Sequence, residues 1–185
     1  MEMKFLMTGL LAVSFGLFVS ETSVAQQPAV QPPAASTNPL DVIPEKLAFN
    51  IPYGEPITLA KADAVIAAAV GEANKRGWPL NITVVDSGGN LVSYRRMDGA
   101  ILAGITISEK KARASVTYRR PTKVFQNATQ SSLINVFLTL DGVVASAGGI
   151  PLVENGKIIG AIGCSGGSGS QDEVVATAGA AVVNK

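Results

Sequence analysis

The sequence predicts an α+β fold in which helices pack against an antiparallel sheet. From Ile57 onward, apolar periodicity and turn residues follow the order helix, hairpin, helix, hairpin, helix. Both pairs of apolar strands are joined by short links rich in Asp, Asn and Gly, which favour antiparallel hairpins. Helices do not alternate singly with strands, as they would in a parallel nucleotide-binding sheet. We expect about five strands, in the order α-β-β-α-(α)-β-β-β-α.

The first 56 residues are expected to precede the folded domain. Lys4, the apolar run 5–19 and the small residues Ser23 and Ala25 have the pattern of a signal peptide over 1–25. The run is shorter than the roughly 20 apolar residues of a membrane span, although an uncleaved anchor stays open. The proline-rich stretch 26–56 is typical of an unpacked linker or arm. We therefore expect a periplasmic or secreted protein with its domain at 57–185.

The domain is predicted to begin with a helix and a hairpin. Thr58 is a favourable N-cap, and apolar residues then recur at three- and four-residue steps until Gly77 and Pro79 end the helix. The next two apolar runs, 80–85 and 91–97, flank a turn with the sequence Asp-Ser-Gly-Gly-Asn. These runs predict the first antiparallel hairpin.

A second long helix is predicted over 101–120, where Pro121 ends it. Its basic residues lie toward the C-terminus, which suits the helix dipole. The following chain is less regular: we expect one short helix over 122–130, part strand and part loop over 133–140, and a short strand over 143–147.

The second hairpin and the last helix complete the predicted domain. The runs 150–153 and 157–164 flank Asn155-Gly156, the strongest short signal for a hairpin, and Pro151 suggests an edge strand or a bulge nearby. A glycine-rich stretch follows. Ser170 and Glu173 then match the spacing of a capping box, which predicts the start of the last helix.

Two residue counts exclude several kinds of site. The chain has no histidine, so a Ser-His-Asp triad, a His-based zinc site and a His-ligated haem iron cannot form. Cys164 is the single cysteine, which excludes an internal disulfide. Residues 163–167 fit the G-x-S-x-G pattern of a nucleophile elbow, but only a Ser-Lys variant with Lys110 or Lys111 stays open. The net charge of +1 gives no footprint for nucleic acid.

Four stretches together resemble the GlcG/HbpS-like family, also called the haem-binding or haem-degrading domain family. They are TVVDSGGNLVSYRRMDGA at 83–100, ISEKKARAS at 107–115, GGIPLVENGKIIGAIGCSGG at 148–167 and QDEVVATAG at 171–179. The resemblance covers residues 57–183. It implies a profilin-like antiparallel sheet, a dimer-based homo-oligomer such as an octamer, and a small anionic ligand, with haem as the possible cofactor. This chain departs from family members that could ligate iron by imidazole, because it has no histidine.

The family motifs also imply which residues bind the ligand. The cationic side chains would bind a propionate or another carboxylate, and the N–H groups of the glycine loop would hold one anionic group at a helix start. Catalytic and metal-ligating residues are not predicted. The implied ligand-binding residues are Arg96, Met97, Asp98, Lys111, Arg113, Gly149, Ser165, Gly166 and Gly167.

Several of these residues have a plainer structural interpretation. Arg96 and Asp98 could form a surface ion pair, Met97 could fill the core, and Cys164 could be a small buried apolar residue instead of a thiolate ligand or redox sensor. Three functions therefore stay open. The first is an exported protein that binds haem or a related tetrapyrrole for haem or iron handling or sensing. The others are an enzyme or accessory protein acting on a small organic carboxylic acid, and a purely structural assembly module.

Overall fold

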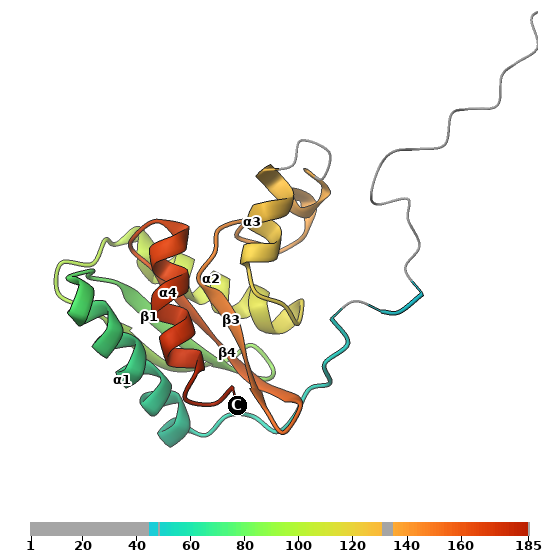
Figure 1. The fold of residues 1–185 in the computed structure, drawn as a ribbon, viewed down its shortest axis with the longest axis horizontal. Coiled ribbons are helices and arrows are strands. Elements are labelled where there is room, and N and C mark those ends of the chain that lie inside the picture. Colours follow the sequence, from blue (N-terminus) through green and yellow to red (C-terminus); the bar gives the residue numbers. More distant parts are fainter. Residues whose placement is uncertain (1–44, 48, 131–134, 185) are drawn as a thin grey trace, which may run out of the picture. The chain divides into compact units, whose positions relative to one another are not determined.

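The structure is a computed structural model, and it describes residues 45–47, 49–130 and 135–184. The predicted signal peptide and residues 26–44 of the predicted linker lie outside the described residues. Within the described ranges, no helix is both long enough and apolar enough to cross a membrane. The elements, shown in Figure 1, are α1 (Leu59–Arg76), β1 (Asn81–Asp86), β2 (Leu91–Arg96), α2 (Ala103–Thr117), α3 (Lys123–Gln130), the 3-10 helix η2 (Asn135–Thr139), β3 (Gly149–Glu154), β4 (Lys157–Ser165) and α4 (Gly169–Ala180).

The predicted α+β class is confirmed, with four described strands where about five were expected. The sheet is antiparallel, and its strand order is β2-β1-β4-β3. The strand predicted over 143–147 is wrong, because that segment is irregular. A strand over 143–147 would have to pair with the outer edge of β3, where Thr122 already exchanges hydrogen bonds with Gly149. The Ala147 N–H donates instead to Gln126 Oε1, at 2.7 Å.

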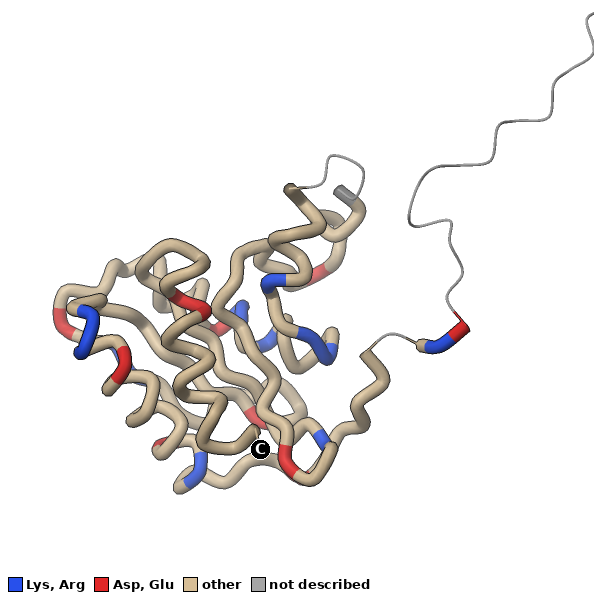
Figure 2. Tube along the Cα trace, viewed as in Figure 1, with Lys and Arg blue, Asp and Glu red and all other residues tan. Residues whose placement is uncertain are grey.

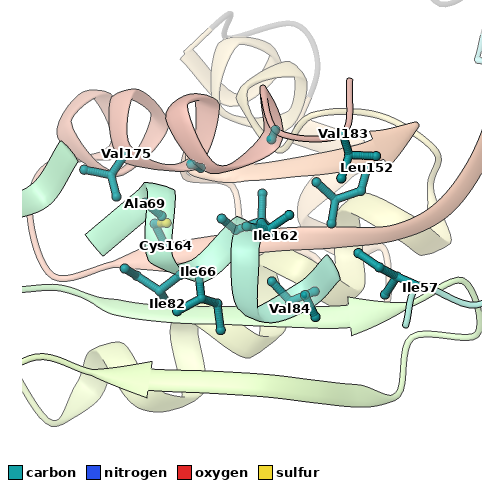
Figure 3. Close-up of a cluster of buried hydrophobic side chains, with 14 of the residues drawn as sticks. Ile57, Ile66, Ala69, Ile82, Val84, Leu152, Ile162, Cys164, Val175 and Val183 are labelled. Atoms are coloured by element: carbon teal, nitrogen blue, oxygen red, sulfur yellow. The ribbon is translucent and has the colours of Figure 1, made fainter. Parts of the chain in front are cut away.

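Helices cover both faces of the sheet. Alternate residues of β1 point to opposite faces. Ile82 and Val84 join the core beneath α1 and α4, which Figure 3 shows in close-up. Val85 packs with Ala112 and Val116 of α2 on the other face. The fold is therefore a central sheet with two apolar layers, and among the described helices α2 packs on β1 and β4 opposite α1 and α4.

Local turn chemistry explains where the elements begin and end. Thr58 Oγ1 accepts the Lys61 N–H at 3.4 Å, and Gly77 takes the left-handed conformation at the end of α1, as predicted. In the second hairpin, Asn155 and Gly156 both have positive φ, at 50° and 72°, which a two-residue type I′ turn requires.

The capping box of α4 lies two residues earlier than predicted. Ser168 Oγ accepts the Gln171 N–H at 3.3 Å, and Gln171 Oε1 accepts the Ser168 N–H at 2.8 Å. Glu173 instead forms an ion pair with Lys123 at 2.8 Å. The Ser168 and Ser170 pairs share the same three-residue spacing, so the spacing alone could not decide between them.

Part of the predicted linker packs on the domain. Tyr53 Oη donates to the carbonyl oxygens of Val116 and Thr117, both at 3.0 Å, at the C-terminal end of α2. Pro52 O accepts the Ile158 N–H, and Gly54 N–H donates to Ile158 O. The folded domain therefore includes residues before Ile57, the predicted boundary.

Candidate functional site

A shallow groove borders the end of β2 and one face of α1. Its volume is about 420 Å³, which lies within the range of small-molecule pockets. The motif Arg96-Met97-Asp98 supplies half of the lining, and its role in ligand binding stays a prediction. Arg95, which was not among the predicted site residues, also lines the groove. The full lining is Val70, Asn74, Arg95, Arg96, Met97 and Asp98.

The side chains of this groove divide into an apolar floor and a charged rim. Met97 is half-buried and packs against the core, and its Sδ lies 3.5 Å from the Leu80 N–H. Met97 therefore fills the edge of the core, which was its plainer structural interpretation. Arg96 and Asp98 are both exposed, and the described residues show no ion pair between them. The rim thus presents guanidinium groups that no described carboxylate neutralises.

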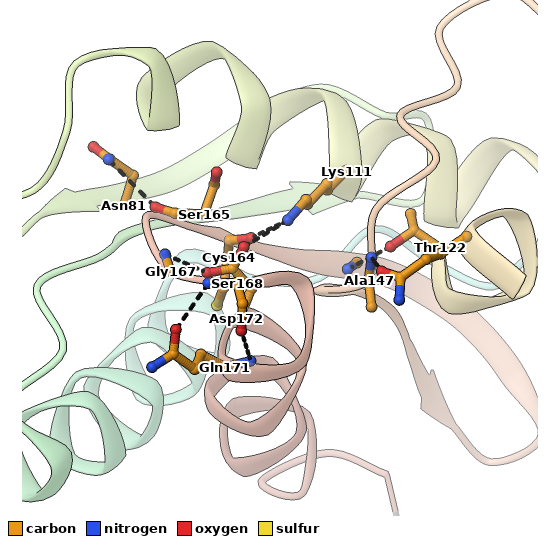
Figure 4. Close-up of polar contacts among 12 residues, drawn as sticks. Asn81, Lys111, Thr122, Ala147, Cys164, Ser165, Gly167, Ser168, Gln171 and Asp172 are labelled. Carbon is orange, nitrogen blue, oxygen red and sulfur yellow. Dashed lines mark hydrogen bonds and ion pairs between the residues drawn. The ribbon is translucent and has the colours of Figure 1, made fainter. Parts of the chain in front are cut away.

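Lys111, the second predicted cation, lies in the protein interior. Its Nζ donates to Asp172 Oδ2 at 2.7 Å and to Cys164 O at 3.2 Å, as Figure 4 shows. The two side chains are only 1% and 2% exposed. The pair joins α2 to the first turn of α4, so it ties together elements on opposite faces of the sheet.

The glycine loop at Gly166 and Gly167 binds a carboxylate of the protein itself, that of Asp172. Gly167 N–H donates to Asp172 Oδ1 at 2.9 Å. Burial raises the pKa of Asp172, while Lys111 and the N–H groups of Gly167 and Gly166 act in the opposite direction. The N–H that was expected to bind a ligand anion is thus used by Asp172. Sequence reasoning missed this residue as a site member, although a carboxylate just after a glycine loop at a helix start is a usable signal.

Gly149 and Ser165 lie next to the buried pair without contacting its charges. A Cβ on Gly149 would collide with the Lys111 carbonyl oxygen and with Thr122, so glycine allows β3 to approach α2 closely. Ser165 is buried at the end of β4, and its carbonyl accepts the Asn81 side-chain amide at 3.4 Å. The described hydrogen bonds of Lys111 do not include Ser165, so no Ser-Lys nucleophile is assembled there.

Arg113 occupies a third place, on the exposed side of α2. Its Nη2 pairs with Glu109 at 2.9 Å, one helical turn away. It lines a small cavity of about 240 Å³ with Tyr118 and Asp141. The predicted site residues are therefore distributed over the β2 groove, the buried cluster and the outer face of α2. Figure 2 shows charges of both signs along most of the described trace, but the charged residues between 110 and 123, in α2 and at the start of α3, are all basic.

Cys164 is a buried thiol, not an exposed nucleophile. It is 0% exposed and belongs to the main hydrophobic core. Burial, reinforced by the charge of Asp172, raises the pKa of the Cys164 thiol far above its ordinary value. A neutral, enclosed thiol is a poor iron ligand and a poor redox sensor.

We expect Cys164 to resist alkylation by iodoacetamide at pH 8 in the folded protein and to react readily in denaturant, because only unfolding exposes its thiol. Mass spectrometry of samples quenched over time measures the modified fraction. A free-thiol peptide in the same tube serves as the control for reagent activity. Complete labelling of the folded protein at the rate of that peptide would contradict the buried position.

Comparison with known proteins places this arrangement in one family. Residues 57–181 match the family described as haem degrading protein HbpS-like. The chain is 41% identical to Protein GlcG of Escherichia coli (strain K12) over 104 residues, which are 56% of this chain and 77% of that protein.

Two solved structures are similar in fold. A double mutant of HbpS from Streptomyces reticuli gives a TM-score of 0.65 at 30% identity, with 85% of this chain and 100% of that chain covered. A complex of PduOC with heme gives a TM-score of 0.64 at 30% identity, covering 70% and 96%. The family match spans nearly all of the described domain, from the start of α1 to the end of α4. The chain therefore belongs to the GlcG/HbpS-like family.

Proposed function

We propose that this protein is exported and binds haem or a related tetrapyrrole in the groove at the end of β2. The observation that carries the proposal is the composition of the groove, where arginines at the rim stand beside an apolar floor. A tetrapyrrole needs both features, since its ring is apolar and its propionates are anionic. The family description and the heme complex of the related PduOC support the same class of ligand.

The residues of the groove suggest how each part of the ligand would be held. Arg96 carries a planar guanidinium that pairs bidentately with a carboxylate. Val70 and Met97 offer apolar contact to the ring. Asp98 is exposed at the rim of the groove and carries a carboxylate that could serve as an oxygen ligand to iron in a chain without histidine. Bound haem would supply redox-active iron, and the residues of the groove would bind and orient it.

Export is part of the proposal because of the N-terminal sequence. Lys4 precedes an uncharged apolar run over 5–19 and small residues at 23 and 25. A protein outside the cytoplasm that binds a tetrapyrrole would suit the handling or sensing of haem or iron.

Titration of the purified protein with haemin tests the binding. We expect a saturable change in the Soret band at micromolar haemin. Arg96→Ala should weaken the affinity about 10-fold, because one charge-assisted hydrogen-bonding group is lost. Arg113→Ala is the matched control, since it removes an exposed arginine outside the groove and should leave the affinity unchanged. A titration without saturation would refute haem binding, and equal affinity in wild type and Arg96→Ala would refute the groove as its site.

A second ligand class fits the polar side of the same groove. Asn74, Arg95 and Arg96 offer hydrogen-bond donors around an open, shallow surface. This arrangement suits a small organic carboxylate, for which an enzyme or accessory protein would be the function. A carboxylate that raises the melting temperature where haemin does not would favour this second class.

A further inference from the structure

The segment 49–57, called the arm, and the tip of the β3–β4 hairpin line a further hollow. Its volume is about 390 Å³, within the range of small-molecule pockets. It shares no lining residue with the β2 groove. In Figure 1 the arm passes this end of the hairpin on its way to α1. The lining residues are Tyr53, Gly54, Glu55, Glu154, Asn155, Lys157 and Ile159.

Backbone hydrogen bonds fix the wall of the hollow that the arm supplies. β4 extends beyond the end of β1 with its residues 157–159, and the arm pairs with β4 there. Ile158 N–H donates to Pro52 O, and Gly54 N–H donates to Ile158 O, both at 2.8 Å. A Cβ on Gly54 would lie 2.9 Å from Lys157 Cβ, so the arm backbone rests against the base of that lysine. Both walls of the hollow are therefore held by the sheet.

The ion pair at the hairpin tip leaves Lys157 without its cross-strand partner. Glu154 lies opposite Lys157 in the β3–β4 register, where opposite charges attract each other. Both carboxylate oxygens of Glu154 instead accept hydrogen bonds from Lys61 Nζ of α1, at 2.7 and 2.8 Å. Lys157 is exposed and takes part in none of the described ion pairs. Its ammonium is therefore available to a carboxylate in the hollow.

Glu55 supplies the opposite charge from the arm. It is exposed and likewise takes part in none of the described ion pairs. Gly54, the preceding residue, lies against the base of Lys157, so the two charges border the same hollow without pairing with each other. The lining also includes Ile159, which offers apolar contact, and the amide of Asn155 at the hairpin turn.

We propose that this hollow binds a small dipolar molecule that carries both an ammonium and a carboxylate, as a free α-amino acid does. The ligand ammonium pairs with Glu55 of the arm. The ligand carboxylate pairs with Lys157 and accepts a hydrogen bond from the Asn155 amide. This site is distinct from the β2 groove, and the proposal does not depend on haem binding there.

The balance of charge selects a dipolar ligand over a simple ion. Lys61 already neutralises Glu154, so the remaining charges of the hollow, Glu55 and Lys157, sum to zero. A lone anion would gain the ammonium of Lys157 but lie near the carboxylate of Glu55, and a lone cation would meet the reverse. A ligand with both charges pairs with both side chains at once.

A ligand in this hollow would also fasten the arm to the sheet. It would bridge Glu55 of the arm and Lys157 of β4, so the arm could open only after the ligand had left. Gly54 N–H and Ile57 N–H, which donate to carbonyl oxygens of β4 at 2.8 Å, should then exchange more slowly with deuterium. Hydrogen-exchange mass spectrometry of residues 49–57 measures this protection, and residues 95–98 of the β2 groove should be unchanged.

Thermal unfolding of the purified protein with each of the common L-amino acids tests the site. We expect at least one to raise the melting temperature, while its decarboxylated amine and its deaminated acid do not at the same concentration. In calorimetric titration, Glu55→Gln and Lys157→Gln should each weaken the affinity about 10-fold, because each removes one charge-assisted contact. Lys110→Gln is the matched control, since it removes an exposed lysine that does not line the hollow, and it should bind as wild type does.

Four outcomes would overturn the proposal. They are a panel in which no amino acid stabilises the protein, an amine or acid analogue that binds as tightly as the amino acid, equal affinity in wild type and both variants, and protection of residues 95–98 instead of the arm. The last outcome would place the ligand in the β2 groove. Haemin titration is scored separately, so failure of this site leaves the proposed function untouched, and the reverse also holds.

Discussion

Asp172→Ala is expected to lower the free energy of unfolding by about 3–5 kcal/mol, a large part of the stability of a domain of this size. The Lys111 ammonium would then be enclosed without its counter-ion, because its side chain is only 1% exposed. The variant also removes the acceptor of the Gly167 N–H, which leaves the glycine loop without its contact to α4. Urea unfolding followed by circular dichroism measures the change.

The neighbouring surface pair supplies a matched control. Glu173 lies next to Asp172 on α4 and pairs with Lys123 at 2.8 Å, nearly the same distance as in the buried pair. Lys123 and Glu173 are 51% and 24% exposed, so water screens their interaction. Glu173→Ala should therefore cost less than about 1 kcal/mol. Similar losses of unfolding free energy in Asp172→Ala and Glu173→Ala would show that burial does not determine how much the Lys111–Asp172 pair contributes to stability.

A double variant separates the charge from the packing. Lys111→Met with Asp172→Leu removes both charges and keeps apolar volume in the same place. Its stability should lie above that of Asp172→Ala, because no lone charge is left in the interior. A double variant that is less stable than Asp172→Ala would mean that the pair contributes through its geometry and not only by mutual neutralisation.

The predictable parts of the fold are those whose cause is local. The ends of α1 at Thr58 and Gly77, and the hairpin turn at Asn155-Gly156, depend on interactions within a few residues. The structure has each of them where the sequence predicted it. The strand expected at 143–147 failed because its outcome depends on a distant partner. Apolar residues there would form a strand only beside a free edge of β3, and Thr122 and Asn184 occupy that edge.

The site shows the same division. The motif Arg96-Met97-Asp98 was placed correctly at the end of the second strand, because its position depends on the hairpin alone. The partner of Lys111 could not be found by spacing, since Asp172 lies 61 residues away and approaches across the sheet. Basic residues toward the end of a helix are usually exposed, and the sequence related Lys111 to the helix dipole or to a ligand, whereas the fold encloses it.

Gly163→Ala should be the most damaging single-methyl change in the sheet, with a loss of more than about 3 kcal/mol. A Cβ at Gly163 would collide with the Ser108 carbonyl oxygen and lie 2.6 Å from the Ala112 nitrogen. Both obstacles are backbone atoms of α2, so no side-chain rotation can relieve the contact. The helix would have to move off β4, opening the small apolar cluster of α2 with Val85.

Gly71→Ala adds the same methyl group where nothing opposes it. Gly71 lies within α1, and an added Cβ meets no atom within 4 Å. The substitution should stabilise the protein by about 0.5–1 kcal/mol, because alanine has the higher helix propensity. Urea unfolding of both variants compares one methyl group in two surroundings. Wild-type stability in Gly163→Ala would mean that α2 can withdraw from β4 without cost, and the close approach of helix and strand would then not depend on glycine.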